Sequence, residues 1–304
     1  MNGTEIIALL TQNLTPITTV VSAVVGGIFT SIFLRRNTAT KEFEKIKAGH
    51  FREVAEDLLK TGKMTHMEYY KANNFLDVAQ KADKYYAKLP KRDCFDAYDF
   101  DWFIRFYEAV GNISNEEMQD LWAKILAGEI SHPSSFSLRT IDILKNINKS
   151  DAELFEKICN VSIHSENQYF LPRYDKYLED NEIRYSDIMK LSELGLLYNS
   201  GFIIYSIKLH KGSNIIVKNN SLLATCNISD NNKIFSLNQY PFTQVGYEIA
   251  SLIELCANDK IFLDFISEIQ KENMTIKFEV HRIISEVDKQ VAYQNEDLLE
   301  NYLK

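Results

Sequence analysis

A long uncharged stretch near the N-terminus is the feature that most constrains this chain. No Lys, Arg, Asp, Glu or His occurs from Ile6 to Leu34, and the apolar core of the stretch is Ile17–Leu34. A helix of this length spans roughly 27 Å, just enough for the hydrocarbon core of a bilayer. The stretch therefore predicts one transmembrane helix. The alternatives are a buried helix of a soluble domain and a cleaved signal peptide, which is disfavoured because no basic residue precedes the apolar core.

The flanking charges predict the orientation of this helix. Arg35 and Arg36 follow the apolar core directly, whereas no Lys or Arg precedes it. By the positive-inside rule the short N-terminus lies outside and everything after Arg35 lies in the cytoplasm. We therefore expect a single-pass membrane protein in contact with lipid.

Small residues inside the predicted span suggest self-association. Ser22 and Gly26 are four residues apart, and so are Gly27 and Ser31. This spacing lets two membrane helices approach closely. A homo-oligomer that packs through these four residues is the resulting prediction.

The remainder of the chain has the composition of a folded cytosolic body. The whole chain has a hydrophobic fraction of 45%, and its net charge of -8 argues against a general nucleic-acid coat. The four cysteines are widely spaced and form no CxxC motif, which indicates reduced, mostly buried thiols rather than disulfides or a zinc site.

Apolar residues at helical spacing predict a bundle of about six helices over residues 37–161. Two capping boxes, in which each side chain satisfies the other's free backbone N–H, mark helix starts at Ser114 with Glu117 and at Ser150 with Glu153. The predicted helices are Thr40–Lys60, Thr65–Lys88, Asp99–Tyr107, the helix from Ser114 to Gly128, Phe136–Asn146 and Asp151–Val161.

The pattern changes after Ser162. A helix over Ile183–Leu197 ends in a Leu-Gly-Leu-Leu turn, strands follow, and a helix begins near Phe242. This order resembles a winged-helix arrangement. The predicted fold class is thus mostly α, with a transmembrane anchor (1–36), a helical domain (37–161) and a winged-helix-like α+β domain (162–304). The predicted strands are Phe202–Leu209, Asn214–Ala224, Ile234–Leu237 and Thr275–Ile284.

The most specific motif of the sequence lies in the helical domain. Leu121–Glu129 reads LWAKILAGE, and Phe136–Thr140 reads FSLRT after Pro133. This segment resembles an uncharacterised bacterial family, catalogued as domain of unknown function 2806. It is similar, more loosely, to the Abi-alpha family of abortive-infection proteins over about 50 residues. The resemblance implies a bacterial protein in a phage-defence setting, and it transfers no active site.

The sequence offers no catalytic, cofactor-binding or metal-binding motif. The six histidines are scattered, and no HExxH, GxSxG, P-loop or GxGxxG occurs. We therefore expect a non-enzymatic protein without a cofactor. The best candidate functional patch is Trp122, Glu129 and Arg139 in the family motif. Its structural alternative is that Trp122 is core and that Glu129 pairs with Arg139 across a tight helix turn.

The winged-helix-like region raises the question of DNA binding. Arg184 and Lys190 could contact phosphates, but Glu182, Asp187 and Glu193 lie on the same helix. A DNA-reading helix normally gathers Lys and Arg on its inserted face. A protein-interaction role is therefore favoured, and nucleic acid is possible but not favoured.

These observations lead to a membrane-anchored, non-enzymatic defence protein of the abortive-infection type. Its cytosolic body would sense a phage trigger or a partner protein, and its membrane helices would assemble. The alternatives are a membrane-tethered winged-helix DNA-binding regulator and a membrane scaffold.

Overall fold

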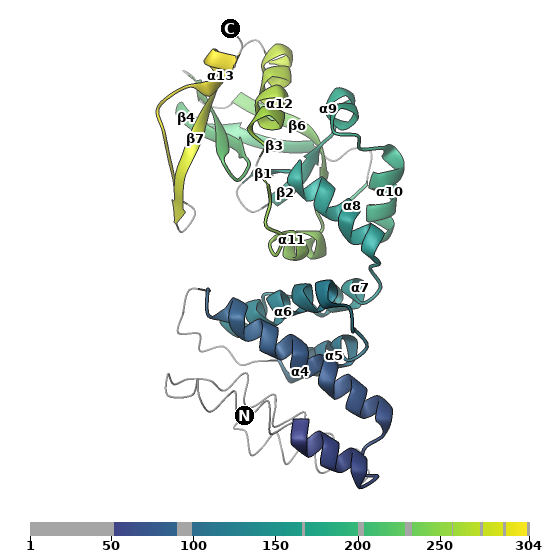
Figure 1. Ribbon diagram of the computed structural model, residues 1–304. Helices are drawn as coiled ribbons and strands as arrows, with labels where there is room; N and C mark the ends of the chain where they lie inside the picture. The colour runs from purple at the N-terminus through teal and green to yellow at the C-terminus, as the bar shows by residue number, and fades with distance from the viewer. Residues whose placement is uncertain are drawn as a thin grey trace. The chain divides into compact units, whose positions relative to one another are not determined.

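The chain folds into two compact units, Met1–Lys145 and Asn146–Lys304, in a computed structural model (Figure 1). The structure describes residues 52–89, 99–165, 168–199, 204–228, 233–256, 258–273, 276–287 and 290–302. The boundary between the units lies before helix α8 (Lys149–Asn160), so this helix belongs to the second unit, whereas the sequence suggested a division after residue 161.

The first unit is helical in its described part. Its helices are α4 (His66–Tyr86), α5 (Phe100–Val110), α6 (Glu116–Ser131) and α7 (Leu138–Leu144), and a further helical segment covers residues 52–60. Gly62, with φ +72°, lies just after that segment, where a left-handed residue ends a helix at low cost.

Aromatic rings form the core of this unit. Phe75 of α4 meets Phe103 of α5 edge-on, with ring centroids 5.7 Å apart. Phe106 of α5 contacts Trp122 of α6 at 5.5 Å and stacks on Trp102 at 5.0 Å. All five side chains are almost completely buried. Edge-to-face and offset-stacked pairs add to the hydrophobic gain of burying large rings.

The helix starts differ from the predicted ones by one or two residues. Asn115, not Ser114, caps α6, and Asn148, not Ser150, caps α8 (Lys149–Asn160). The Asn148 side chain accepts from the backbone N–H of Asp151 at 3.0 Å, and Asp151 accepts in return from the N–H of Asn148. Asn caps a helix as well as Ser does, so a Ser beside an Asn leaves the start ambiguous.

The second unit is an α+β structure built on one large sheet. After α8 its elements are β1 (Ile163–Ser165), β2 (Gln168–Pro172), α9 (Asp175–Asp180), α10 (Tyr185–Glu193), β3 (Ile204–Leu209), β4 (Gly212–Lys218), β5 (Leu222–Ile228), β6 (Lys233–Pro241), α11 (Gln244–Ala250), α12 (Asp259–Glu272), β7 (Phe278–Val287), β8 (Gln290–Tyr293) and α13 (Leu298–Tyr302).

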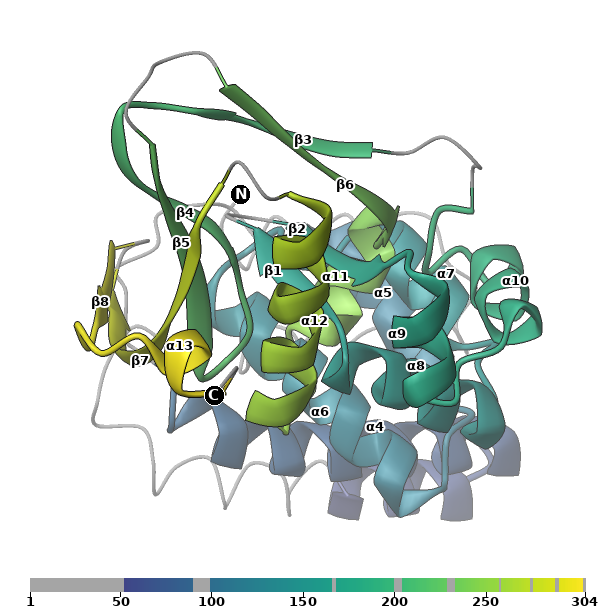
Figure 2. The ribbon, with the colours of Figure 1, turned by 90° about the horizontal axis from the view of Figure 1, so that it is seen from above.

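The eight strands lie in the order β3-β6-β2-β1-β4-β5-β7-β8, and every neighbouring pair is antiparallel. α12 packs against β5 and β7 on one face of the sheet (Figure 2). Phe262, Phe265 and Ile269 of α12 are buried there, as are Phe278 of β7 and Phe235 of β6, whose ring centroids are 5.4 Å apart. This layer is the hydrophobic core of the second unit.

The sheet corrects the predicted fold class. The chain is not mostly α with a small winged-helix-like end, because an eight-stranded antiparallel sheet organises its C-terminal half. The predicted strand Asn214–Ala224 is in fact two strands, β4 and β5, joined by a turn at Asn219–Ser221. β1 and β2 were not predicted, because runs of three and five residues carry little periodicity.

The predicted membrane protein is also contradicted. Across the described ranges of the chain, no helix combines the length and the apolar character needed to cross a bilayer. The predicted span Ile17–Leu34, with Ser22, Gly26, Gly27 and Ser31, lies outside the described residues. The single-pass inner-membrane location is therefore withdrawn.

Candidate functional site

The motif residues of the first unit serve its packing. Trp122 is fully buried in the aromatic core, and Glu129 is 2% exposed. The Glu129 carboxylate accepts from the backbone N–H groups of Ser134, at 2.6 Å, and Phe136, at 3.1 Å. Arg139 lies exposed on α7. The three residues of the candidate patch therefore form no common surface, and the packing interpretation fits the geometry.

Gly128 has a specific reason to be a glycine. A Cβ at this position would lie 2.7 Å from the Phe136 ring, closer than packed side chains allow. The indole N–H of Trp102 also donates to the backbone carbonyl of Phe136, at 2.8 Å. The motif thus locks the turn between α6 and α7, and α6 runs past Gly128 to Ser131 rather than ending there.

The second unit holds α10 firmly at both of its flanks. On one side Lys190 forms an ion pair with Asp151 of α8 at 2.5 Å, and the Asp151 side chain is 4% exposed. The hydrogen bond from Lys190 keeps the pKa of Asp151 below its usual value, despite the opposing effect of burial. Lys190 is therefore occupied within the chain rather than presented to a phosphate.

The C-terminal turn of α10 is fixed against α11. Gly195 adopts φ +76°, and its carbonyl accepts from the Thr243 hydroxyl at 2.6 Å. The N–H of Thr243 donates to the carbonyl of Leu196 at 3.0 Å. A Cβ on Gly246 would lie 2.1 Å from that same carbonyl oxygen. These contacts explain the Leu-Gly-Leu-Leu turn and the Thr-x-x-Gly helix start as one docking arrangement.

Held in this way, α10 buries one face and exposes an aromatic one. Ile188 and Leu191 are fully buried. Tyr185 is 62% exposed, Met189 37% and Tyr198, just beyond the helix, 53%. We call Tyr185, Met189 and Tyr198 the α10 surface. Asn199 lies beside it, with its amide nitrogen 3.4 Å from the Tyr185 hydroxyl. Figure 1 shows α10 at the outer edge of its unit, beside α8.

Carboxylates lie near the N-terminal end of α10. Arg184 precedes the helix in a hollow that it shares with Lys157, Glu179, Glu182, Ile183 and Asp187. The N–H of Arg184 donates to Asp187 at 2.9 Å, and Lys157 donates to the Glu182 carbonyl at 2.8 Å. Arg184 and Lys190 thus lie among acidic groups, which gives the helix little of the positive field that a polyanion requires.

A second group of titratable side chains lies on β1, β2, β4 and β7. Lys218 is nearly buried and forms an ion pair with Glu286. His164, opposite Lys218 in the sheet, has its pKa lowered to about 4 by burial and by that ammonium. Burial, with the charges of Tyr247, Cys159 and Glu286, raises the pKa of Tyr169 to about 12. At neutral pH His164 and Tyr169 are therefore uncharged, and Lys218 is already paired.

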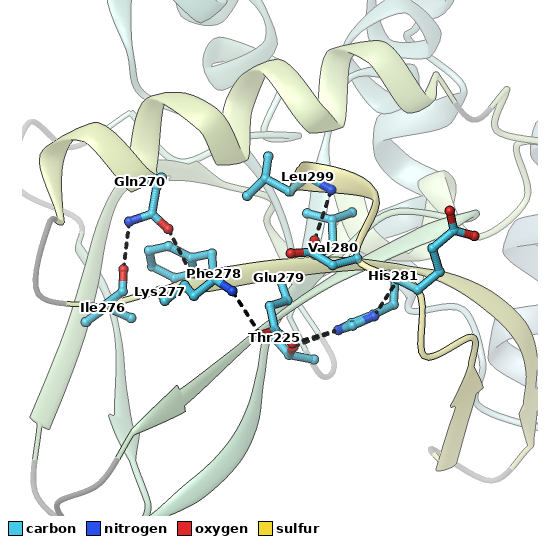
Figure 3. Close-up of polar contacts among 11 residues, drawn as sticks. Thr225, Gln270, Ile276, Lys277, Phe278, Glu279, Val280, His281 and Leu299 are labelled. Carbon is cyan, nitrogen blue, oxygen red and sulfur yellow. Dashed lines mark hydrogen bonds and ion pairs between the residues drawn. The ribbon is translucent and has the colours of Figure 1, made fainter. Parts of the chain in front are cut away.

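A third polar network secures the C-terminal segment (Figure 3). His281 of β7 lies 3.1 Å from the Thr225 hydroxyl of β5 through Nε2 and 3.0 Å from the Glu296 carbonyl through Nδ1. Donation from Nδ1–H to the carbonyl leaves Nε2 to accept from the hydroxyl. Asp297 accepts from the N–H groups of Val280 and Leu299 at 3.1 and 3.0 Å. Thr225 and His281 are both buried, so their pairing stabilises the fold.

Cys159 and Cys226 are buried, whereas Cys256 is exposed. Burial raises the pKa of Cys226 to about 11 and that of Cys159 well above its usual value. A raised pKa lowers the thiolate fraction and with it the reactivity as a nucleophile. Among the described residues no three His, Cys, Asp or Glu side chains are placed to hold a metal ion.

The fold and these sites define a two-unit α+β protein with an exposed aromatic helix surface. Over residues 64–267, more than half of its length, the chain matches DUF2806, described as a protein of unknown function, and it belongs to that family. This confirms the family predicted from the motif, whereas the looser similarity to the Abi-alpha family finds no support. No curated protein and no solved structure matches the chain.

Proposed function

We propose that this protein is a non-enzymatic, partner-binding protein, and that its α10 surface binds a basic segment of another protein. The observation that supports this most is the exposure of Tyr185, Met189 and Tyr198 on a helix fixed by α8 and α11. Exposed Tyr side chains on a rigid support bury a large contact area at low entropic cost, and an exposed Met adapts its shape to a partner, so both are typical of protein-binding surfaces.

The charges around the surface specify the partner's chemistry. Glu179, Glu182, Asp187 and Glu193 lie near or on α10, whereas Lys190 is neutralised by Asp151. Opposite charge at the rim of an interface steers association and selects partners. A partner with an apolar side chain or two flanked by Lys or Arg fits this surface. A DNA duplex does not, because it would meet the carboxylates.

The raised pKa values of two buried thiols and of Tyr169 agree with a non-enzymatic role. Catalytic nucleophiles and bases are activated by shifts toward their reactive form at neutral pH. Here the pKa values of Cys159, Cys226 and Tyr169 are raised instead. The wider setting that we propose, bacterial phage defence, rests on the resemblance of the motif and is tested separately below.

The proposal predicts a position-specific cross-link. A photo-reactive phenylalanine analogue at Tyr185 of the full chain, in its native host, should join one discrete protein with a basic segment. The same analogue at Tyr302, 39% exposed on α13, is the matched control and should not. Met189→Lys should remove the Tyr185 adduct, since it replaces an apolar contact with a charge of the same sign as the basic partner. Equal adducts at both positions, or none at Tyr185, would contradict the proposal.

Two further measurements separate the remaining possibilities. Fluorescence anisotropy with a random-sequence DNA duplex at low and moderate salt should show no binding, and binding that Arg184→Ala weakens would favour a DNA-binding protein instead. Plating efficiency of phages should fall in cells that express the chain and recover with Met189→Lys. A cross-link without any change in plating would keep the partner surface and remove the defence setting.

A further inference from the structure

β3 forms one edge of the sheet and is a second exposed feature, separate from the α10 surface. β3 lies at one end of the strand order and pairs with β6 on one side (Figure 2). In the described part of the chain no strand pairs with its other side. The outer side of such a strand presents backbone N–H and C=O groups that another strand can satisfy.

The inner face of β3 anchors it to the core. Leu209 is fully buried, and the ring of Tyr205 stacks on Phe170 of β2 with centroids 5.6 Å apart. β3 is therefore a fixed template rather than a loosely attached segment. Its outer face carries Ile204, which is 55% exposed, Ser206 and Lys208.

The two edges of the sheet differ in how they resist pairing. β8, at the opposite end, has four residues, and its pairing with β7 contains a register shift between Ile283 and Ser285. Short edge strands and irregularities are devices that block edge-to-edge association. β3 has six residues, contains no proline, and carries one charge, Lys208. Its composition thus favours strand addition.

We propose that β3 pairs antiparallel with β3 of a second copy of this chain, around a two-fold axis at Ser206. Even-numbered residues of β3 point outward in both copies, so this register sets Ser206 against Ser206 and Lys208 against Ile204. Both hydrophobic cores then lie on the same side of one continuous sheet.

The charge pattern selects a second copy in this orientation. The positive residues Lys208 and Lys233 lie at one end of the β3–β6 ribbon, since Lys233 is opposite Leu209. The other end, with Ile204 opposite Asn238, is uncharged. Antiparallel pairing separates the two Lys208 side chains by about 14 Å along the strand, beyond the Debye length. Parallel pairing would place them roughly 5 Å apart.

The same register covers exposed apolar surface. Ile234 of β6, 69% exposed, is opposite Lys208 of β3. In the dimer the aliphatic stem of Lys208 would lie between Ile234 and the Ile204 of the second copy. Lysine stems commonly cover apolar surface while the ammonium stays in water. Two pairs of isoleucines, one on each side of the axis, are shielded in this way.

Sedimentation equilibrium on the full chain tests this interface. The parent should show a reversible species of about twice 35.2 kDa. Ser206→Glu and Ser206→Lys should each weaken self-association at least tenfold, because like charges meet at the axis. A mixture of the two variants should associate again. Circular dichroism checks that both variants fold.

The matched control is Ser236→Glu. Ser236 is exposed on β6 directly opposite Ser206, with the two hydroxyls 3.0 Å apart. It lies three strand spacings, about 14 Å, from its counterpart across the axis, so this change should leave the dimer intact. A parent that stays monomeric would overturn the proposal. So would a Ser206→Glu variant that dimerises like the parent, or a mixture that fails to associate.

Discussion

Glu129 shows how one side chain can account for a sequence motif. Its carboxylate is buried, and it closes the turn after α6 by accepting from two backbone N–H groups. An acidic residue inside a sequence motif invites a catalytic interpretation. Here the acceptor capacity of both oxygens is directed at the chain's own backbone.

Replacing Glu129 with Gln should therefore lower the free energy of unfolding by about 1–3 kcal/mol, because the amide NH₂ cannot accept and one buried N–H loses its partner. Thermal or urea unfolding of the full chain measures this change. Glu116→Gln, at an exposed position at the start of the same helix, is the control and should cost less than about 0.5 kcal/mol. If the two changes cost the same, Glu129 does not hold the turn.

At the scale of elements, an ion pair contributes to the contact between α8 and α10. Lys190 bonds to Asp151 in the first turn of α8, while Lys190 itself is 45% exposed and Asp151 4%. The pair thus joins a solvated ammonium to a buried carboxylate. Solvent screens the ammonium, so the stabilisation is that of a charged hydrogen bond rather than of a fully buried pair.

Lys190→Met should destabilise the second unit by about 1–2 kcal/mol at pH 7. The lowered pKa of Asp151 means that the contribution is present above its unfolded value near 4 and is lost as pH falls through the lower folded value. The difference between parent and variant should therefore shrink below about pH 4. Urea unfolding across pH 3–7 measures it. Lys149→Met, at an exposed pair with Glu153, is the control. A pH-independent difference would contradict the assignment.

The sequence predicted helices far better than the sheet. α4, α5 and α11 lie where helices were predicted from apolar spacing, which is a local signal, although the caps Thr65, Asp99 and Thr243 were not predicted. Residues that pair in the sheet are between 3 and about 70 positions apart in the sequence. The order in which the strands pair has no local signal. The position of β3 at an edge follows from this order and could not have been predicted.

The candidate site, too, was predicted from the sequence only in part. Arg184 and Lys190 were chosen because they are basic and lie on one predicted helix. The structure adds Asp151, thirty-odd residues earlier, as the partner of Lys190. Tyr185 and Met189 are four residues apart and so are neighbours on the helix, beside the buried Ile188 rather than opposite it, and the sequence pattern alone does not show that they are exposed. The contribution of Tyr198 depends on the turn that follows.

For the whole molecule, the two units have separate cores within one family match. The match to DUF2806 runs from Met64, before α4, into α12, and so includes parts of both units. The aromatic core of α4, α5 and α6 lies in the first unit, and the core of α12 and the sheet lies in the second. Each core can therefore be weakened without direct loss of contacts in the other.

Calorimetry of the full chain should accordingly resolve two transitions that respond to different substitutions. Trp122→Ala removes a fully buried side chain from the first unit, and Phe278→Ala removes one from the second. Each should cost its own unit about 3–5 kcal/mol, which lowers one transition by roughly 10 °C or more. The other transition should stay within about 2 °C in each case, a margin small against that shift. If either substitution lowered both transitions equally, the two units would unfold as a single cooperative body.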